Sequence, residues 1–353
     1  MRKTAAKLLA AAAIATSVAT VASGVAVADP ATGVTPAAQD IVGVGSDTTQ
    51  AVLNGLSAGY NASLAAAGNT TSPRLYSWDA TGSATIVTKT GADANFTRPN
   101  GSGAGIKQLE QKTSTTVDFA RSSRARQAGD QATDTFVTLA KDAVSWAAKN
   151  GGNAPASLTT DQLKDIFTCA KTNWHDINAA WPNSTIKPFL PQADSGTRAF
   201  FLKAIGGGVT VNPGACVVSG TQENQGTDSV LDDNDAIVPY SVAHYIGQVW
   251  NGKATGTDAQ GPLTIRDVNS VTPVVLSGTP AVHVINPSFA STAYGRVIYN
   301  VVRQAEWVAT DTHGQALRAI FGTSGWICSA AGAAIVKDYG FLALPAGACG
   351  STV

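Results

Sequence analysis

Three short loops of glycine, serine and threonine recur along this chain, and each leads into a segment with the pattern of a helix. They lie at residues 45–49 (GSDTT), 101–105 (GSGAG) and 194–198 (DSGTR). A loop of small residues that opens into a helix leaves unpaired backbone N–H groups, with short hydroxyl donors beside them. Three such loops in one chain predict a single small oxyanion held from several sides, and hence a fold that brings distant turns together.

The N-terminal segment has the pattern of a secretory signal peptide. Basic residues precede an apolar run from residue 8 to about residue 27, and small residues fit cleavage after Ala28. A membrane anchor is the alternative, but the run is rich in Ala, Ser, Thr and Gly rather than in long aliphatic residues. No cysteine that could carry a lipid lies near the cleavage point. We therefore expect a secreted, extracytoplasmic protein, with residues 29–39 as a loose linker.

Chain length and net charge limit the architecture and the class of partner that we expect. Removal of the signal peptide would leave 353 − 28 = 325 residues, more than one hydrophobic core usually holds, so we expect two lobes. It would also remove three of the 24 basic residues and none of the 24 acidic ones, for a net charge of 21 − 24 = −3. This charge argues against nucleic acid as a partner. Local dipoles and a few placed charges must then bind the anion.

The four cysteines form an even set in an exported chain, which predicts two disulfides with three possible pairings. We favour Cys169–Cys216 and Cys328–Cys349, because each bond would close a local excursion of the chain. The cysteines show no CxxC spacing, and the four histidines are scattered without an HxxxH pattern. We therefore expect no metal site.

Strand and helix patterns alternate, which predicts an α/β architecture. A buried strand at 41–44 precedes the first loop, and the apolar spacing of 49–64 indicates a helix. Thr159 or Thr160 can cap a helix that ends near residue 167. The other expected segments are strands at 74–78, 116–119, 136–139, 143–147, 186–190, 237–240 and 281–285, helices from 106, at 199–205, 297–308 and 329–337, an exposed polar excursion at 251–270, and a turn or strand at 340–344.

The ordered motifs resemble those of type 2 periplasmic solute-binding proteins, specifically the phosphate-binding component of ABC importers. The resemblance covers residues 40–345 and depends on the order of the motifs rather than on any one of them. It implies two α/β lobes, each a mixed sheet flanked by helices, with a hinge between them and the ligand in the cleft. The matching segments are 44–49, 100–108, 117–124, 158–167 with Asn173 and Trp174, 194–198 and 339–345.

The same resemblance divides the chain into two lobes. Lobe 1 would comprise residues 40–138 plus 286–353, and lobe 2 would comprise residues 139–285. The hinge would lie near residues 139–142 and 285–287.

The residue pattern and the resemblance place the anion between four loops. Hydroxyl groups and helix-start amides supply donors from many directions without a large net charge, and Arg198 would add a charge-assisted contact. The predicted ligand-binding residues are Ser46, Asp47, Thr48, Ser102, Gly103, Ser122, Ser123, Ser195, Gly196, Thr197 and Arg198.

Asp47 has two interpretations. Its carboxylate could accept the remaining proton of a protonated phosphate, which sulfate lacks at neutral pH, or it could only cap the following helix. The chain also departs from the best-known family pattern, with Ser123 in place of an Asp and with Pro191 and Gln192 where an Arg precedes the Ser-Gly-Thr motif. These departures leave the identity of the bound anion open. Arg121 and Arg124 could face either the cleft or the solvent.

Three functions fit these observations. The first is a non-catalytic, monomeric protein without a cofactor that binds inorganic phosphate and delivers it to the membrane permease of an ABC importer. The second is a secreted binder of another oxyanion or small solute that acts as a scavenger, sensor or adhesin. The third is a secreted phosphatase, but the sequence has no GxSxG elbow and no histidine-rich metal cluster.

Overall fold

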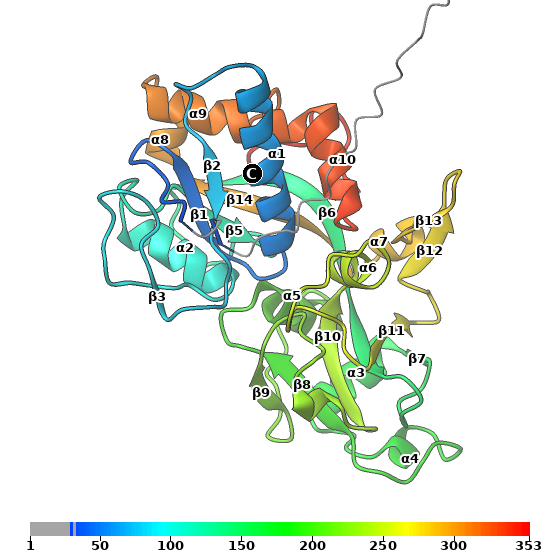
Figure 1. Cartoon of the computed structure of the whole chain (residues 1–353). Helices are drawn as coiled ribbons and strands as arrows, with labels where there is room; N and C mark the ends of the chain where they lie inside the picture. Colours follow the sequence, from blue (N-terminus) through cyan, green and yellow to red (C-terminus); the bar gives the residue numbers. More distant parts are fainter. Residues whose placement is uncertain (1–28, 31–32) are drawn as a thin grey trace, which may run out of the picture.

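The computed structural model describes residues 29–30 and 33–353, and shows two α/β lobes joined through one long strand (Figure 1). The predicted signal peptide, residues 1–28, lies outside the described residues, as do positions 31–32 of the linker. The long strand is β6 (Asp134–Lys149), and the sheet has the order β2-β1-β5-β14-β6-β10-β8-β9. The predicted two-lobed α/β fold with mixed sheets is confirmed.

In the first lobe, parallel strands lie at the edge of the sheet and antiparallel strands lie toward its centre. β1 (Ile41–Gly45) pairs in parallel with β2 (Leu75–Ser77) and with β5 (Phe119–Ser122). β14 (Gly295–Arg303) is antiparallel to both β5 and β6. Every residue of β1 is buried, as expected of a strand covered on both faces. The small strands of this lobe are β3 (Thr85–Ile86), β4 (Phe96–Thr97) and β15 (Leu342–Ala343).

In the second lobe, β10 (Ala236–Ser241) is antiparallel to β6 and parallel to β8 (Lys187–Pro191). β9 (Val218–Thr221) extends the sheet beyond β8, and β11 (Leu263–Val268) pairs with the far end of β6. The remaining strands are β7 (Ser157–Leu158) and the hairpin of β12 (Val274–Ser277) and β13 (Val282–Ile285).

Helices begin at each of the three predicted loops. α1 (Gln50–Ala66), α2 (Ser102–Gln111) and α5 (Gly196–Ile205) start there. Among the described residues no single helix is long and apolar enough to cross a bilayer, although one bent pair, 312–328 with 330–338, meets the test by length and composition. The other helices are α3 (Thr160–Phe167), α4 (Trp174–Ile177), α6 (Val242–Trp250), α7 (Pro287–Ala290), α8 (Gln304–Val308), α9 (Thr312–Phe321), α10 (Ala330–Asp338) and the 3-10 turns η1 (Ser229–Leu231) and η2 (Trp326–Cys328).

The segment predicted as a helix at 297–308 is mostly the central strand β14, with only the short α8 at its end. That prediction is wrong because a strand buried on both faces is apolar throughout, and periodicity alone does not distinguish it from a buried helix. The two strands predicted at 136–139 and 143–147 form the single strand β6. The predicted excursion at 251–270 contains β11, which pairs with β6, and the buried residue Asp258.

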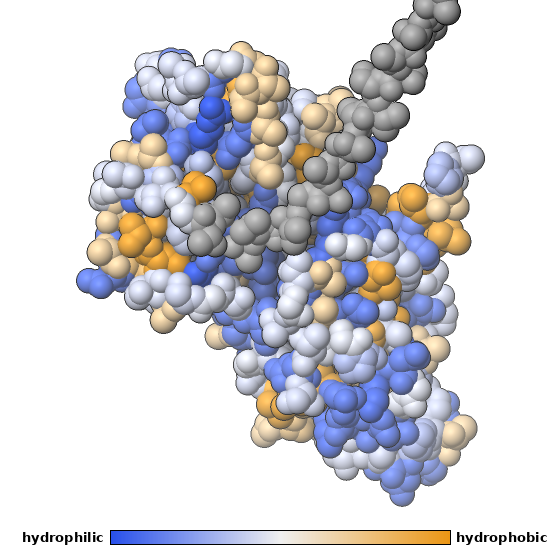
Figure 2. Space-filling view, in the orientation of Figure 1, coloured by the Kyte–Doolittle hydropathy of each residue, from blue (hydrophilic) through white to orange (hydrophobic). Residues whose placement is uncertain are grey.

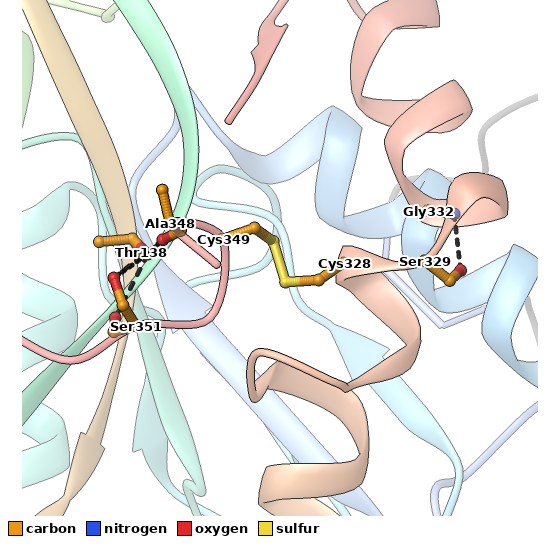
Figure 3. The surroundings of a disulfide bond; sticks show 7 residues. All are labelled: Thr138, Cys328, Ser329, Gly332, Ala348, Cys349 and Ser351. Carbon is orange, nitrogen blue, oxygen red and sulfur yellow. Dashed lines mark hydrogen bonds between the residues drawn. A yellow bond between two sulfur atoms is a disulfide. The ribbon is translucent and has the colours of Figure 1, made fainter. Parts of the chain in front are cut away.

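Both favoured disulfides are confirmed: Cys169 is bonded to Cys216, and Cys328 to Cys349. Figure 3 shows the second bond linking the η2 turn to the C-terminal segment. Beside it, the Thr138 hydroxyl on β6 donates to the Ala348 carbonyl. The C-terminal segment is thus fastened to the first lobe by a covalent bond and by hydrogen bonds.

The surface in Figure 2 is mostly hydrophilic, with small and separate apolar areas. The main apolar core instead lies inside each lobe, around side chains such as Phe119 in the first lobe and Phe167 in the second. The interior of the interface between the lobes is polar, and this polar interior is the candidate site.

Candidate functional site

The first and third loops meet directly across the two lobes. The Thr48 and Thr197 hydroxyl oxygens lie 3.1 Å apart, although the residues are 149 positions apart in sequence. Thr48 lies just before α1 and Thr197 lies in the first turn of α5. The two side chains are 1% and 0% exposed. The starts of two helices from different lobes therefore face a common buried region.

The second loop closes against the third at a distance that only glycine allows. A Cβ atom on Gly196 would lie 2.3 Å from the hydroxyl oxygens of Ser102 and Ser123. The Gly103 N–H also donates to the Asp194 carbonyl at 3.0 Å. Ser102 Oγ accepts the Ser123 N–H at 3.0 Å, which holds the two serines side by side. Residues of the second loop, of the Ser122–Ser123 turn and of the third loop are thus in contact.

Asp47 lies fully buried at the start of α1 and turns its carboxylate toward the other lobe. Its two oxygens accept from Gln222 Nε2 at 3.0 Å and Asn224 Nδ2 at 3.2 Å. Burial raises the pKa of Asp47 well above its ordinary value, and the nearby Asp258 and Glu223 carboxylates raise it further. No side chain caps the start of α1, so the capping alternative for Asp47 is not what the structure shows.

A second buried carboxylate, Glu223, joins the same cluster. Its Oε1 accepts from the Thr48 hydroxyl at 2.7 Å and from the Thr197 N–H at 3.2 Å. Asn224, the next residue, is fixed because its carbonyl accepts from Tyr240 Oη at 2.5 Å and its side-chain oxygen accepts the Ser241 N–H at 3.0 Å. The segment 222–224 therefore contributes three consecutive side chains to the interface between the lobes.

A buried cation, Arg296 on β14, contacts Thr197 of the cluster. Its guanidinium donates to Asp142 Oδ2 from Nε at 3.0 Å and from Nη2 at 2.7 Å, and Nη2 also donates to Thr197 Oγ1 at 2.9 Å. Its side chain is 2% exposed. Arg296 is thus a second candidate cation for the site, beside the Arg198 that the sequence analysis predicted.

Several polar atoms of this region are buried without a hydrogen-bond partner in the described part of the chain. Buried polar groups are nearly always paired, so a cluster of unpaired ones indicates where a ligand or water is bound. Arg296 Nη1 is a donor and the hydroxyl groups can also donate, as an oxyanion requires. These atoms include Ser46 Oγ, Thr49 Oγ1, Thr221 Oγ1, Arg296 Nη1 and the acceptor Glu223 Oε2.

Three predicted ligand residues, Arg198, Ser122 and Ser195, make local contacts. Arg198 Nη1 donates to the carbonyl of Pro191, the last residue of β8, at 2.9 Å. The Ser122 hydroxyl donates to the Arg124 carbonyl at 2.7 Å and so shapes its own turn. Ser195 Oγ accepts the Arg198 N–H at 3.0 Å as the N-cap of α5. Ser195 therefore fixes the start of α5, and this contact leaves its hydroxyl proton available for a ligand.

Arg121 and Arg124 have structural partners. Arg121 is fully buried and donates to the Ser46 carbonyl at 3.0 Å and to the Trp78 carbonyl at 2.6 Å. These hydrogen bonds hold the first loop in place. Arg124 binds both oxygens of Asp130, at 2.7 and 2.8 Å, and this ion pair lowers the pKa of Asp130 although partial burial opposes it.

A buried His–Asp pair supports the first loop from the second lobe. His244 Nε2 lies 2.6 Å from Asp258 Oδ1, and Nδ1 lies 3.2 Å from the Thr48 carbonyl. Burial alone would lower the pKa of His244, but the Asp258 carboxylate outweighs it and raises the pKa to about 10. The imidazolium therefore donates to both oxygens and ties α6 to the start of α1.

Sequence reasoning missed Gln222, Glu223, Asn224 and Arg296. The segment 222–224 has neither a glycine-rich pattern nor a helix after it, and Arg296 precedes a segment expected to be helical. One feature of the sequence could have identified Arg296, which directly precedes a run of apolar residues. An arginine buried with such a run almost always has an acidic or polar partner. Among the described residues, no group of three or more His, Cys, Asp or Glu side chains could hold a metal ion.

Sequence comparison finds relatives over part of the chain. The chain is 34% identical over 67 residues to "Phosphate-binding protein PstS" of Staphylococcus haemolyticus, which covers 19% of this chain and 21% of that protein. It is 25% identical over 173 residues to "Protein SphX" of Synechocystis, covering 46% of this chain and 51% of that protein. The matches thus span from about a fifth to half of the length of these relatives.

Structure comparison extends over most of the chain. A crystal structure of an ABC-type phosphate transport receptor from Vibrio cholerae matches with a TM-score of 0.55 at 16% identity, covering 86% of this chain and 100% of the other. A phosphate-bound structure of a substrate-binding protein from Clostridium perfringens matches with a TM-score of 0.56 at 18% identity, covering 86% and 99%. At these identities the likeness concerns the fold. The family model described as a PBP superfamily domain matches residues 30–306, and the chain therefore belongs to the PBP superfamily.

Proposed function

We propose that this protein binds inorganic phosphate between its two lobes and delivers it to the membrane permease of an ABC importer. The observation that carries the proposal is the buried meeting of hydroxyls and helix starts from both lobes around Asp47 and Arg296. The names of the relatives point the same way, since they include phosphate-binding and phosphate transport proteins. Secretion would place the protein outside the cytoplasm, where an importer collects its solute.

The proposed ligand set combines predicted and newly identified residues. Ser46, Thr48, Ser102, Ser123 and the amides at Gly196 and Thr197 would donate to phosphate oxygens, with Arg296 as the cation. Asp47 would accept the proton that phosphate keeps near neutral pH. Sulfate has no such proton, so its oxygens would face the carboxylate as a buried acceptor–acceptor mismatch, which costs about 1–3 kcal/mol or more.

We propose that the lobes, with the boundaries 40–138 plus 286–353 and 139–285, open and close about a hinge. Residues 139–142 lie within β6, and residues 285–287 run from the last residue of β13 to the first residue of α7. Closure would bring the loop before α5 onto the loops before α1 and α2 and exclude water. Ser195 serves as a helix cap, which supports a binding role rather than a nucleophilic one.

The test is isothermal titration calorimetry on the mature, phosphate-stripped protein with phosphate, sulfate, molybdate and a panel of sugars at two pH values. We expect tight binding of phosphate and little binding of sulfate. Binding of sugars alone would overturn the anion assignment. Hydrolysis of a generic phosphatase substrate that is lost in Ser195→Ala would replace the binding role with a catalytic one.

A further inference from the structure

The donors that the proposed site offers to phosphate are already used in part by a carboxylate of the protein itself. Thr48 Oγ1 has one proton, and it is directed at Glu223 Oε1 2.7 Å away. The Thr197 amide has one proton as well, and it is directed at the same oxygen at 3.2 Å. Neither donor can serve a bound anion while Glu223 remains in this position.

Both acceptor positions of the Thr48 hydroxyl oxygen are also occupied. Its oxygen accepts from Asn224 Nδ2 at 3.1 Å and lies 3.1 Å from Thr197 Oγ1. Since the Thr48 proton goes to Glu223, the Thr197 hydroxyl is the donor in that pair. A hydroxyl group has one donor and two acceptor positions, so Thr48 has no capacity left. A phosphate oxygen can reach the Thr48 proton only by exchange with Glu223.

The position of Glu223 is one in which an anion would be stabilised. Thr197 is the second residue of α5, and its amide is among the N–H groups that have no partner inside the helix, at the positive end of the helix dipole. Glu223 is fully buried, and its second oxygen has no hydrogen-bond partner within the described residues. No ion pair of the described chain involves Glu223. Its carboxylate therefore receives only part of the compensation that a buried charge needs.

We propose that Glu223 is a built-in competitor of the bound anion: its carboxylate occupies the Thr48 hydroxyl and the Thr197 amide, and phosphate gains these donors only by displacing it. This proposal rests on the proposed phosphate-binding function and adds a residue that sets its affinity. Opening of the lobes separates Thr48 from Glu223, because the two residues belong to different lobes. Opening thus frees the Thr48 hydroxyl, whereas the Thr197 amide lies in the same lobe as Glu223 and becomes available only when the anion displaces the carboxylate.

The affinity test compares the wild type with Glu223→Gln, which keeps the shape of the side chain and removes its charge. The hydroxyl of Thr48 and the amide of Thr197 form stronger hydrogen bonds with a carboxylate than with a neutral amide. Phosphate should therefore bind roughly tenfold more tightly to E223Q. The matched control is Asp176→Asn, which removes one carboxylate charge from an exposed position on α4 of the same lobe and should leave the affinity unchanged. Equal or weaker phosphate binding by a folded E223Q, judged from its circular dichroism, would overturn the proposal.

A second measurement does not depend on phosphate. In the phosphate-stripped wild type, hydrogen–deuterium exchange at the Thr197 amide should be slow, and in Glu223→Ala it should be at least about tenfold faster. Rapid hydrogen–deuterium exchange at the Thr197 amide of the wild type would overturn the proposal that Glu223 occupies this amide, whatever the calorimetry shows. A protected Thr197 amide combined with absence of phosphate binding in both wild type and E223Q would instead refute the proposed function and, with it, competition against phosphate.

Discussion

The guanidinium of Arg296 is held by a single oxygen of Asp142, through Nε at 3.0 Å and Nη2 at 2.7 Å. The two residues are direct partners across the antiparallel strands β14 and β6. The pair lies beside one of the predicted hinge crossings, and Arg296 also reaches Thr197 in the second lobe. A fixed cation is thus presented to the interface between the lobes without a rise in the net charge of the protein.

Arg296→Lys is expected to weaken phosphate binding by about tenfold or more, because lysine keeps the charge but cannot form the same fork of donors. Arg296→Ala should in addition lower the free energy of unfolding by about 3 kcal/mol, since it leaves Asp142 buried without a cation. Calorimetry and urea unfolding measure the two effects. Arg198→Ala is the control and should change the affinity little; a larger loss in R198A than in R296K would return the anion-binding role to Arg198.

Asp47→Asn should reduce the preference for phosphate over sulfate. The amide offers a donor as well as an acceptor, so a fully ionised oxyanion no longer meets a buried carboxylate. The dissociation constant for sulfate divided by that for phosphate, both measured at neutral pH, should fall by about tenfold or more. An unchanged ratio would show that Asp47 has no part in choosing the anion.

Gly196→Ala should impair closure of the lobes while leaving each lobe folded. The added methyl group would lie 2.3 Å from the hydroxyls of Ser102 and Ser123, too close for any contact between them. We expect phosphate affinity to fall by more than about tenfold, with little change in the melting temperature. Gly129→Ala is the matched control, because a Cβ atom there meets nothing within 4 Å. Normal affinity in G196A would mean that the loops do not close as described.

Stability should decline at alkaline pH through the His244–Asp258 pair. The pKa of His244 is raised from 6.5 to about 10 in the folded protein, so its contribution is complete below pH 6.5 and is lost as pH rises through 10. The raised pKa of Asp47 has the same sign, with a contribution that is lost as pH rises above the ordinary range of an aspartate. The free energy of unfolding, measured with urea from pH 6 to above pH 10, should fall over this range.

His244→Gln isolates the histidine from the other titrating groups. It should destabilise the protein at pH 7 by about 3 kcal/mol, because Asp258 loses its buried partner. Its pH profile should also be flatter than that of the wild type between pH 7 and pH 10. Parallel profiles for the two proteins would contradict a charged His244 in the folded state.

The two disulfides should differ in their contribution to stability. They close segments of 47 and 21 residues, and chain entropy predicts losses of about 4 and about 3 kcal/mol when each is removed. Double Cys→Ser variants at 169 and 216, and at 328 and 349, would be compared by urea unfolding. The larger loss should follow removal of the Cys169–Cys216 bond, and the opposite order would contradict an entropic origin.

The sequence by itself determined the local features of this protein. Small residues before helical patterns located the starts of α1, α2 and α5, and the alternation of patterns indicated an α/β fold. The cysteine spacing favoured the observed disulfide pairing. These features are encoded within a few residues of one another or by simple proximity along the chain, so pattern and composition reveal them.

The tertiary structure alone decided which charged groups reach the site. Arg296 lies on a strand buried on both faces, where apolar periodicity does not tell strand from helix, and its partner Asp142 is 154 positions away. Glu223 meets Thr48 at a separation of 175 residues, through a segment without a recognisable motif. The pairing of strands and the contact between lobes set these distances. A local pattern carries no record of them, because they depend on how the whole chain packs.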